Sequence, residues 1–300
     1  PALTTPTVYE FESRFSSGVS SVSYTGQVVR QLLINDIKTQ AGTDAGSGDA
    51  SVLLSMMANH DTDRVILTTT NPASMQTTYR EISSSHLNDR LNAVSGVDGA
   101  PNYVLVGYGH NAKDQIAEWV TDLVNNGKTN SDGLRLDQMI QKTLWGAVSY
   151  WQATSKYMSK IPDDDNSMAS NGSAYTAMEH HWDESFGYFG AARDFNTGYE
   201  DDNDRKSDPY YDSNSDNQID FKTEYNSGWA VTAAKRDIVD ATEDYDFTKT
   251  IMDAYLEGRT LIYNQAPLEE ILVQREIILL SLIHISEPTR PRLISYAVFC

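Results

Sequence analysis

Apolar residues recur at spacings of three and four along most of this chain, which is the period of a helix that buries one face. The clearest examples begin near Tyr24, Asn111 and Asp132. Gly127 and Pro162 follow two of these segments and are typical of helix ends. We predict helices over residues 24–37, 48–59, 111–125, 133–157, 174–195, 221–239, 247–263 and 268–279. Alternating strand patterns are almost absent, so the pattern predicts an all-α fold, a helical bundle.

Two stretches of the chain do not follow this helical pattern. Residues 1–22 are rich in Thr, Ser and Pro, which predicts an N-terminal tether with a short extended piece around Tyr9. The stretch from 60 to 103 is rich in Thr, Asn and Ser and predicts mostly loop.

The last segment, 280–300, has the sequence that a sequencing adapter encodes. Residues 280–290 correspond to a common transposase-library adapter, and residues 294–300 to the flow-cell primer that follows it. Three residues stand between them in the place of a sample index. We therefore predict that 280–300 is not native and that 23–279 is a helical domain truncated at its C-terminal end. The alternative is a genuine apolar C-terminal helix.

Composition narrows the class of protein. The chain has 300 residues, 40% of them hydrophobic, and a formal net charge of −19. This charge repels phosphate backbones, so we expect no nucleic-acid partner. Its one cysteine, Cys300, falls in the adapter segment, which excludes disulfides and thiolate metal sites. The acidic, Asn- and Tyr-rich composition favours a secreted or periplasmic protein, and no apolar run before the tail approaches a membrane span.

The first candidate site is the block Glu-His-His-Trp-Asp-Glu at 179–184. On a helix, Glu184 is four residues from His180 and three from His181, so these side chains can share one face. Imidazole nitrogen and carboxylate oxygen on one face can bind a cation such as iron. The alternative is structural: the histidines hydrogen-bond neighbours, and Glu179 and Asp183 form a solvated face.

The second candidate site resembles an EF-hand-type calcium loop. Asp212, Asn214 and Asp216 occupy its first three ligand positions, and Asn217 stands where glycine normally permits a left-handed turn. The pattern continues with a carbonyl from Gln218, a buried Ile219 and a ligand at Asp220, and then Glu224. Glu224 comes one residue later than the pattern requires, because Thr223 holds that position. The alternative is a solvated acidic loop.

Several segments together resemble an uncharacterised bacterial family, the domain of unknown function numbered 4856, over about residues 9–274. They are residues 24–27, 174–194, 212–224, 225–230, 234–237 and 258–261. This resemblance implies an all-helical bundle related to the imelysin-like iron-regulated proteins. It also implies an exported location, as a periplasmic protein or an outer-membrane lipoprotein whose lipid anchor this chain does not contain.

In imelysin-like proteins a Gly-x-His-x-x-Glu motif is the expected metal site. The resemblance assigns its His to His181 and its Glu to Glu184, while Glu179 replaces its Gly. Our first hypothesis is thus a non-enzymatic iron- or haem-binding protein of the cell envelope. His181 and Glu184 would be its primary ligands, His180 would support them or be an alternative ligand, and calcium would be a structural ion. The alternatives are a metallopeptidase in which Glu184 is the general base, and a helical scaffold without metal at the histidines.

Overall fold

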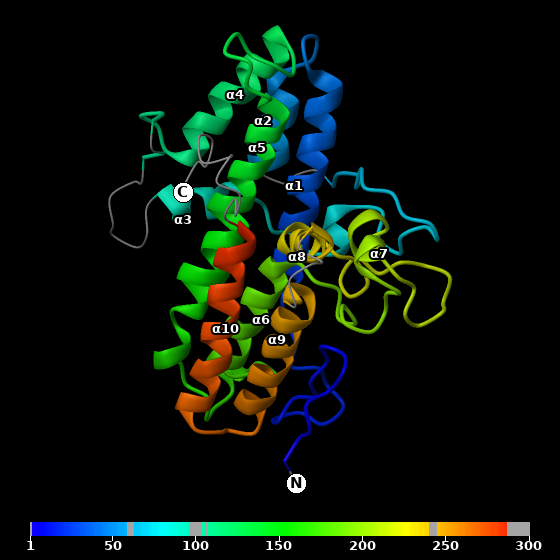
Figure 1. Ribbon diagram of the computed structural model, residues 1–300, viewed down its shortest axis with the longest axis vertical. Helices are drawn as coiled ribbons and strands as arrows, with labels where there is room; N and C mark the ends of the chain where they lie inside the picture. Colours follow the sequence, from blue (N-terminus) through cyan, green and yellow to red (C-terminus); the bar gives the residue numbers. More distant parts are fainter. Residues whose placement is uncertain (1, 59–62, 96–103, 106, 240–244, 287–300) are drawn as a thin grey trace. The chain divides into compact units, whose positions relative to one another are not determined.

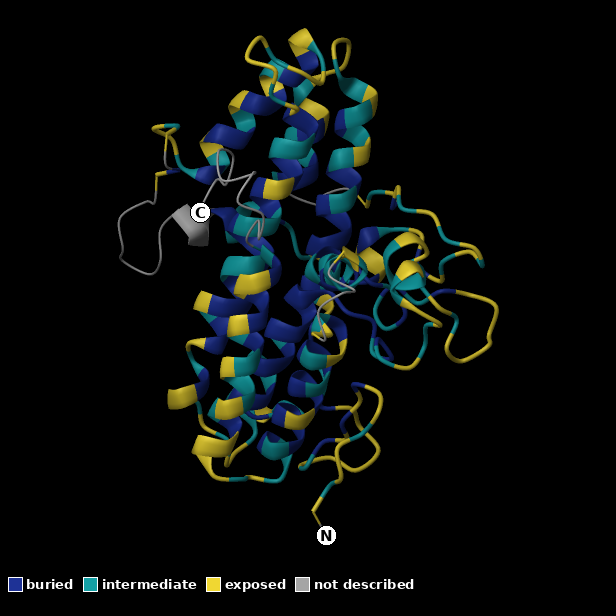
Figure 2. Ribbon diagram, in the orientation of Figure 1, coloured by how far each residue is buried: buried dark blue, intermediate teal, exposed yellow. Residues whose placement is uncertain are grey.

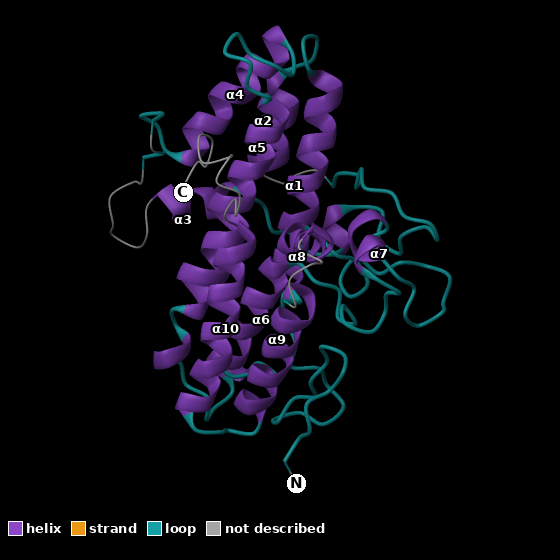
Figure 3. Cartoon of the chain, in the orientation of Figure 1, coloured by secondary structure: helices purple, strands orange, loops and turns teal. Residues whose placement is uncertain are grey.

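The computed structural model describes residues 2–58, 63–95, 104–105, 107–239 and 245–286 (Figure 1). These described residues form helices and loops and contain no β-strand, apart from isolated bridges (Figure 3). The prediction of an all-α helical fold is confirmed. The α-helices are α1 (Thr25–Asp44), α2 (Ala50–Ala58), α3 (Asn88–Ser95), α4 (Ala112–Asn126), α5 (Leu136–Leu144), α6 (Ala177–Phe189), α7 (Asp202–Ser207), α8 (Gly228–Val239), α9 (Phe247–Tyr263) and α10 (Leu268–Ser286).

The chain divides into two compact units, each with its own core. Among the described residues, the first unit consists of those within 2–25, 70–75 and 152–286, and the second of those within 26–69 and 76–151. Buried residues line the inward faces of the helices in both (Figure 2). Two π-helical segments, Trp145–Tyr150 and Gln152–Met158, continue the helix begun by α5, and the division between the units falls between them.

In the second unit, α4 packs against α2, α3 and α5. Its core includes Leu33 and Ile37 of α1 and Ile116 and Val120 of α4, all fully buried. The buried carboxylate of Asp36 accepts hydrogen bonds from Tyr79 and from Thr68 (2.6 Å), which ties the loop after α2 to α1.

In the first unit, α6 packs against α8 and α9, and α9 packs along α10. Trp182 and Phe186 of α6 and Tyr255 of α9 are fully buried, and the Trp182 indole donates to the Tyr255 carbonyl (3.0 Å). A Cβ added at Gly258 would lie 2.1 Å from the Trp182 ring. Only glycine therefore permits α9 to approach α6 this closely.

Several predicted helix boundaries are wrong. The helix predicted over 174–195 is α6, which starts after the cap Thr176 and ends at Phe189 because Gly190 adopts a left-handed conformation (φ 84°). The helix predicted from 221 starts at Gly228 instead. Two short helices, α3 and α7, form in stretches without a clear apolar period. Helix α10 continues from Leu268 through residue 280 to Ser286, and residues 287–300 of the predicted adapter segment lie outside the described residues.

The N-terminal segment packs onto the first unit. Tyr9 and Phe11 are buried, and a bridge joins Glu12 to Ser20. The Tyr9 ring stacks on Phe186 of α6 with centroids 3.8 Å apart. This segment is therefore part of the core of the first unit.

Candidate functional site

Helix α6 presents the histidine cluster beside its buried apolar face. Thr176 and Glu179 form a capping box that starts the helix. Met178, Trp182, Phe186 and Phe189 are buried. His180 and His181 lie at the edge of this face, with ring centroids 6.2 Å apart.

His181 is held through both ring nitrogens. Its Nδ1 lies 2.7 Å from Oδ2 of Asp164, and its Nε2 lies 3.2 Å from Nζ of Lys160. A carboxylate accepts and an ammonium donates, so the neutral tautomer that satisfies both contacts has its proton on Nδ1 and its lone pair on Nε2. Sequence reasoning missed both partners, because they lie 17 and 21 residues from His181 in a loop without apolar periodicity.

His180 has different partners. Its ring stacks on Tyr175 with centroids 4.4 Å apart, and its Nε2 lies 3.7 Å from Oε2 of Glu184. The pKa of His180 is lowered, mainly by burial of the imidazole, and the negative charge of Glu184 partly opposes this shift. The imidazole is therefore neutral near pH 7, which is the form that binds metals.

The number of donors limits which metal the cluster can hold. Within the ranges that the structure describes, no three His, Cys, Asp or Glu side chains are grouped to hold a metal ion. An iron site whose ligands all come from the protein needs at least three such side chains around one point. Haem iron, in contrast, takes as little as one axial imidazole from the protein. His181 is one imidazole oriented by Asp164, and its Nε2 lies 3.2 Å from Nζ of Lys160.

Next to the histidines lies a buried ionic network that sequence reasoning also missed. Glu179 and Asp183, for which a solvated face was the alternative, are fully buried, as is Arg259 of α9. Arg259 donates from Nη1 to Glu179 (3.0 Å) and from Nε to Asp183 (2.9 Å). The positions of Glu179 and Asp183 within the α6 sequence do not predict their burial. It depends on Arg259, which comes from a helix more than 70 residues away.

The N-terminal segment completes this network. Arg259 also donates to Ser21 Oγ (2.8 Å), and the Tyr9 hydroxyl donates to Asp183 (2.8 Å). Arg14 donates to Glu179 (3.3 Å). Burial raises the pKa of Asp183 to about 6, and the charge of Arg259 opposes this shift. The network joins α6, α9 and the N-terminal segment.

The acidic loop at 212–224 has the backbone shape that its sequence predicts. Asp212 accepts from the backbone N–H of Asp216 (3.1 Å) and of Asn217 (2.9 Å), and Asn214 Oδ1 also accepts from Asp216 (2.9 Å). Asn217 adopts the left-handed conformation (φ 64°) predicted for the glycine position. The N–H of Gln218 donates to Asp216 (2.9 Å).

The second half of the loop is anchored to the first unit. Ile219 is fully buried, as predicted, and forms a bridge with Ser74. Glu224 is 2% exposed; one of its oxygens accepts from the N–H of Ser213 (2.9 Å) and the other from that of Asp220 (2.8 Å). The late position of Glu224 still places its carboxylate inside the loop.

A further carboxylate lies beside this loop. The backbone N–H of Arg193 donates to the carbonyl of Thr223 (2.8 Å), which places Asp194 next to the end of the loop. Asp194 is buried, and its Oδ1 has no hydrogen-bond partner among the described residues. Burial, followed by the charge of Glu224, raises the pKa of Asp194 to about 6.

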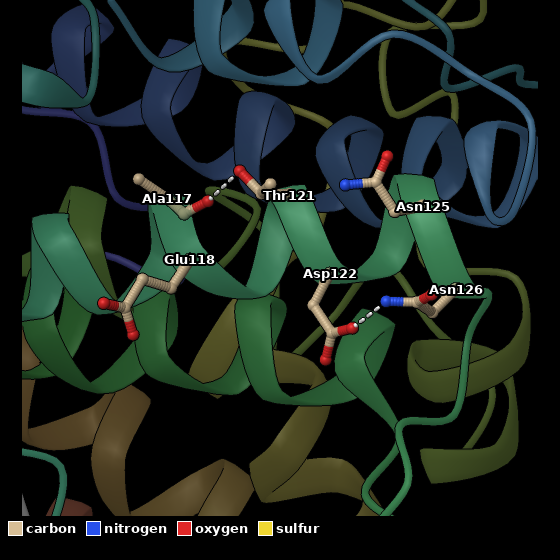
Figure 4. A pocket seen from close by; sticks show the side chains of 6 residues that line it. All are labelled: Ala117, Glu118, Thr121, Asp122, Asn125 and Asn126. Atoms are coloured by element: carbon tan, nitrogen blue, oxygen red, sulfur yellow. Dashed lines mark hydrogen bonds between the residues drawn. The ribbon is translucent and has the colours of Figure 1, made fainter.

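The outer face of α4 forms a shallow open depression in the second unit (Figure 4). Its side chains bond within the helix: Thr121 donates to the Ala117 carbonyl (2.9 Å), and Asn126 donates to Asp122 (2.7 Å). None of the candidate ligands predicted from sequence lines it.

The fold and these sites define an all-α protein with an acidic, Asx-rich loop and a half-buried histidine cluster. The sequence model of the family described as "Domain of unknown function (DUF4856)" matches residues 6–282, and the chain belongs to this family. Neither a curated protein nor a solved structure matches the chain. Among the described residues, no helix is both long and apolar enough to span a bilayer.

Proposed function

We propose that this chain is a non-enzymatic metal-binding protein of the cell envelope that takes haem iron, with His181 as its protein ligand. The observation that carries the proposal is the 2.7 Å hydrogen bond from His181 Nδ1 to Asp164. A carboxylate in this position orients a metal-binding imidazole and makes it more basic.

Haem is favoured over bare iron by the ligand count. His181 would bind through Nε2, Asp164 would hold the ring, and His180 and Glu184 would supply a neutral imidazole and a carboxylate nearby. When bound, haem supplies four of the iron ligands itself. The same count weighs against a metallopeptidase, because among the residues that the structure describes no set of ligands is grouped beside Glu184 to hold a catalytic ion.

The test is titration of the purified full chain with ferric haem, followed by Soret absorbance. We expect His181→Ala to weaken binding more than about 100-fold and Asp164→Asn to weaken it about 10- to 100-fold. His110→Ala, a change at an exposed histidine, is the control. Equal affinity of parent and His181→Ala would remove His181 as the ligand, and chelator-sensitive peptide cleavage lost in Glu184→Gln would support the peptidase instead.

We also propose that the loop at 212–224 binds calcium as a structural ion. The left-handed Asn217 and the buried Ile219 support this, because a solvated acidic loop requires neither. The described carboxylates of this loop are not grouped to hold an ion, so calcium would have to draw its ligands together. Those ligands would be Asp212, Asn214, Asp216, the Gln218 carbonyl, Asp220 and Glu224. Bound calcium would fix the entry to α8, since the loop ends four residues before Gly228.

Calcium binding predicts a rise in melting temperature that grows with calcium concentration, because the ion binds the folded chain alone. The double variant Asp212→Ala/Asp216→Ala should lose this rise. Glu118→Ala/Asp122→Ala, on the open face of α4, changes the net charge equally and should keep it (Figure 4). If calcium does not change the melting temperature of the parent protein, the proposed calcium site is ruled out.

The exported location and the relation to imelysin-like proteins are proposals that rest on the resemblance of the motifs at 174–194. Fractionation of cells that express the native gene tests the location, and recovery in the cytosol would contradict it.

A further inference from the structure

The ammonium group of Lys160 lies beside Nε2 of His181, the nitrogen proposed above as the metal ligand. Its Nζ lies 3.2 Å from Nε2, the only ring nitrogen of His181 that carries a lone pair. The positive charge of Lys160 also acts on His180, where it helps to lower the pKa. The ammonium group thus stands beside both imidazoles of the candidate site.

The local chain geometry fixes this lysine. Lys160 follows the π-helical segment Gln152–Met158, and its Nζ lies 5.8 Å from the centroid of the Tyr157 ring. The short 3-10 turn Ile161–Asp163, which contains Pro162, then leads to Asp164. A five-residue stretch therefore supplies the hydrogen-bond partner of each nitrogen of one imidazole.

We propose that Lys160 is a built-in competitor that must leave His181 before a metal can bind there. The proposal rests on the proposed function, because it concerns the same nitrogen. One lone pair cannot accept a proton donor and coordinate a metal at the same time, so the two states exclude each other. Lys160 sets a threshold: weakly coordinating ions do not displace it, and strongly coordinating iron in haem does.

The cost of displacement determines the size of the effect. A hydrogen bond from a charged donor contributes about 1.5–3 kcal/mol, so its loss on metal binding lowers affinity by about 10- to 100-fold. Removing the ammonium while keeping the apolar stem should restore that affinity. Lys160→Met does this, since methionine keeps a flexible unbranched chain.

The experiment compares ferric-haem titrations of the parent, Lys160→Met, Lys160→Met/His181→Ala and Lys113→Met. Lys113, on α4 in the other unit, is the control for charge. We expect Lys160→Met to bind haem at least about tenfold more tightly than the parent and Lys113→Met. The gain should vanish in the double variant, because it depends on Nε2 of His181.

A second measurement needs no metal. Diethylpyrocarbonate acylates an imidazole nitrogen with a free lone pair, so Lys160→Met, which has no donor, should speed the modification of His181, read by mass spectrometry of the peptide. If haem binds the parent through His181 but Lys160→Met changes neither the haem affinity nor the modification rate, Lys160 is not a competitor. The proposed function would then still stand. If haem binds neither the parent nor Lys160→Met, both proposals fail.

Discussion

Asp194 shows how one residue can couple the stability of this protein to pH. It lies in the turn after α6, buried, with one carboxylate oxygen that makes no hydrogen bond to the described residues. A buried charge without full hydrogen bonding is costly, so the site favours the protonated carboxyl. Its pKa of about 6 is therefore higher than the ordinary value of about 4 in an unfolded chain.

This difference predicts the sign of a pH effect. Between about pH 4 and 6 the folded state holds more protons than the unfolded state, so the free energy of unfolding falls as the pH rises. Above pH 6 this contribution stays constant. In the presence of a chelator, Asp194→Asn should remove a loss on the order of 1–3 kcal/mol between pH 4 and 7, as measured by urea unfolding. Parallel pH profiles for parent and variant would show that Asp194 stays ionised.

At the scale of single residues, sequence reasoning succeeded where the function of a side chain is local. The left-handed turn at Asn217 and the burial of Ile219 follow from their places within one loop. Asp164 and Lys160 could not be found in this way. Their role depends on a contact with His181 that the tertiary fold creates, and aspartate or lysine in a loop is ordinarily solvent-exposed.

At the scale of elements, the long helices were predictable because their signals lie inside the element. Helix α4 has Asn111 as its N-cap, which accepts from Asp114, and Gly127 at its C-terminal end. Its apolar stripe then sets the buried face. The short helices α3 and α7 contain too few turns for a period to be visible, and their formation depends on packing against neighbours.

The close approach of α6 and α9 shows that the residue required at one position of a helix can be set by the neighbouring helix. Gly258 reads as an unfavourable residue inside a helix when α9 is considered alone. Against α6 it leaves the space that the Trp182 ring occupies. The apparent conflict between helix propensity and sequence is thus resolved by packing.

At the scale of the whole molecule, the buried network around Arg259 links parts of the chain that are far apart in sequence. Arg259 is fully buried and pairs with two buried carboxylates, and its guanidinium lies over the Phe11 ring at 4.9 Å. Removing one partner of such a network leaves the others charged and unpaired in the core.

We therefore predict that Arg259→Met lowers the free energy of unfolding on the order of 3–5 kcal/mol. Arg80→Met, at an exposed arginine, should change it by less than about 0.5 kcal/mol. Urea unfolding followed by circular dichroism measures both. Limited proteolysis adds a specific readout, since Arg259→Met should expose the bonds around Tyr9 and Phe11 before those of α6. A variant as stable as the parent would mean that the network contributes nothing net to folding.

The same network has a consequence for the order of events during synthesis. Ser21 and Arg259 are separated by 238 residues, so the N-terminal segment leaves the ribosome well before its partner exists. At roughly 5–20 residues per second, the delay is on the order of 10–50 s. Over that interval Tyr9 and Phe11 remain available to chaperones, and the first unit can form its complete core only after α9 has emerged.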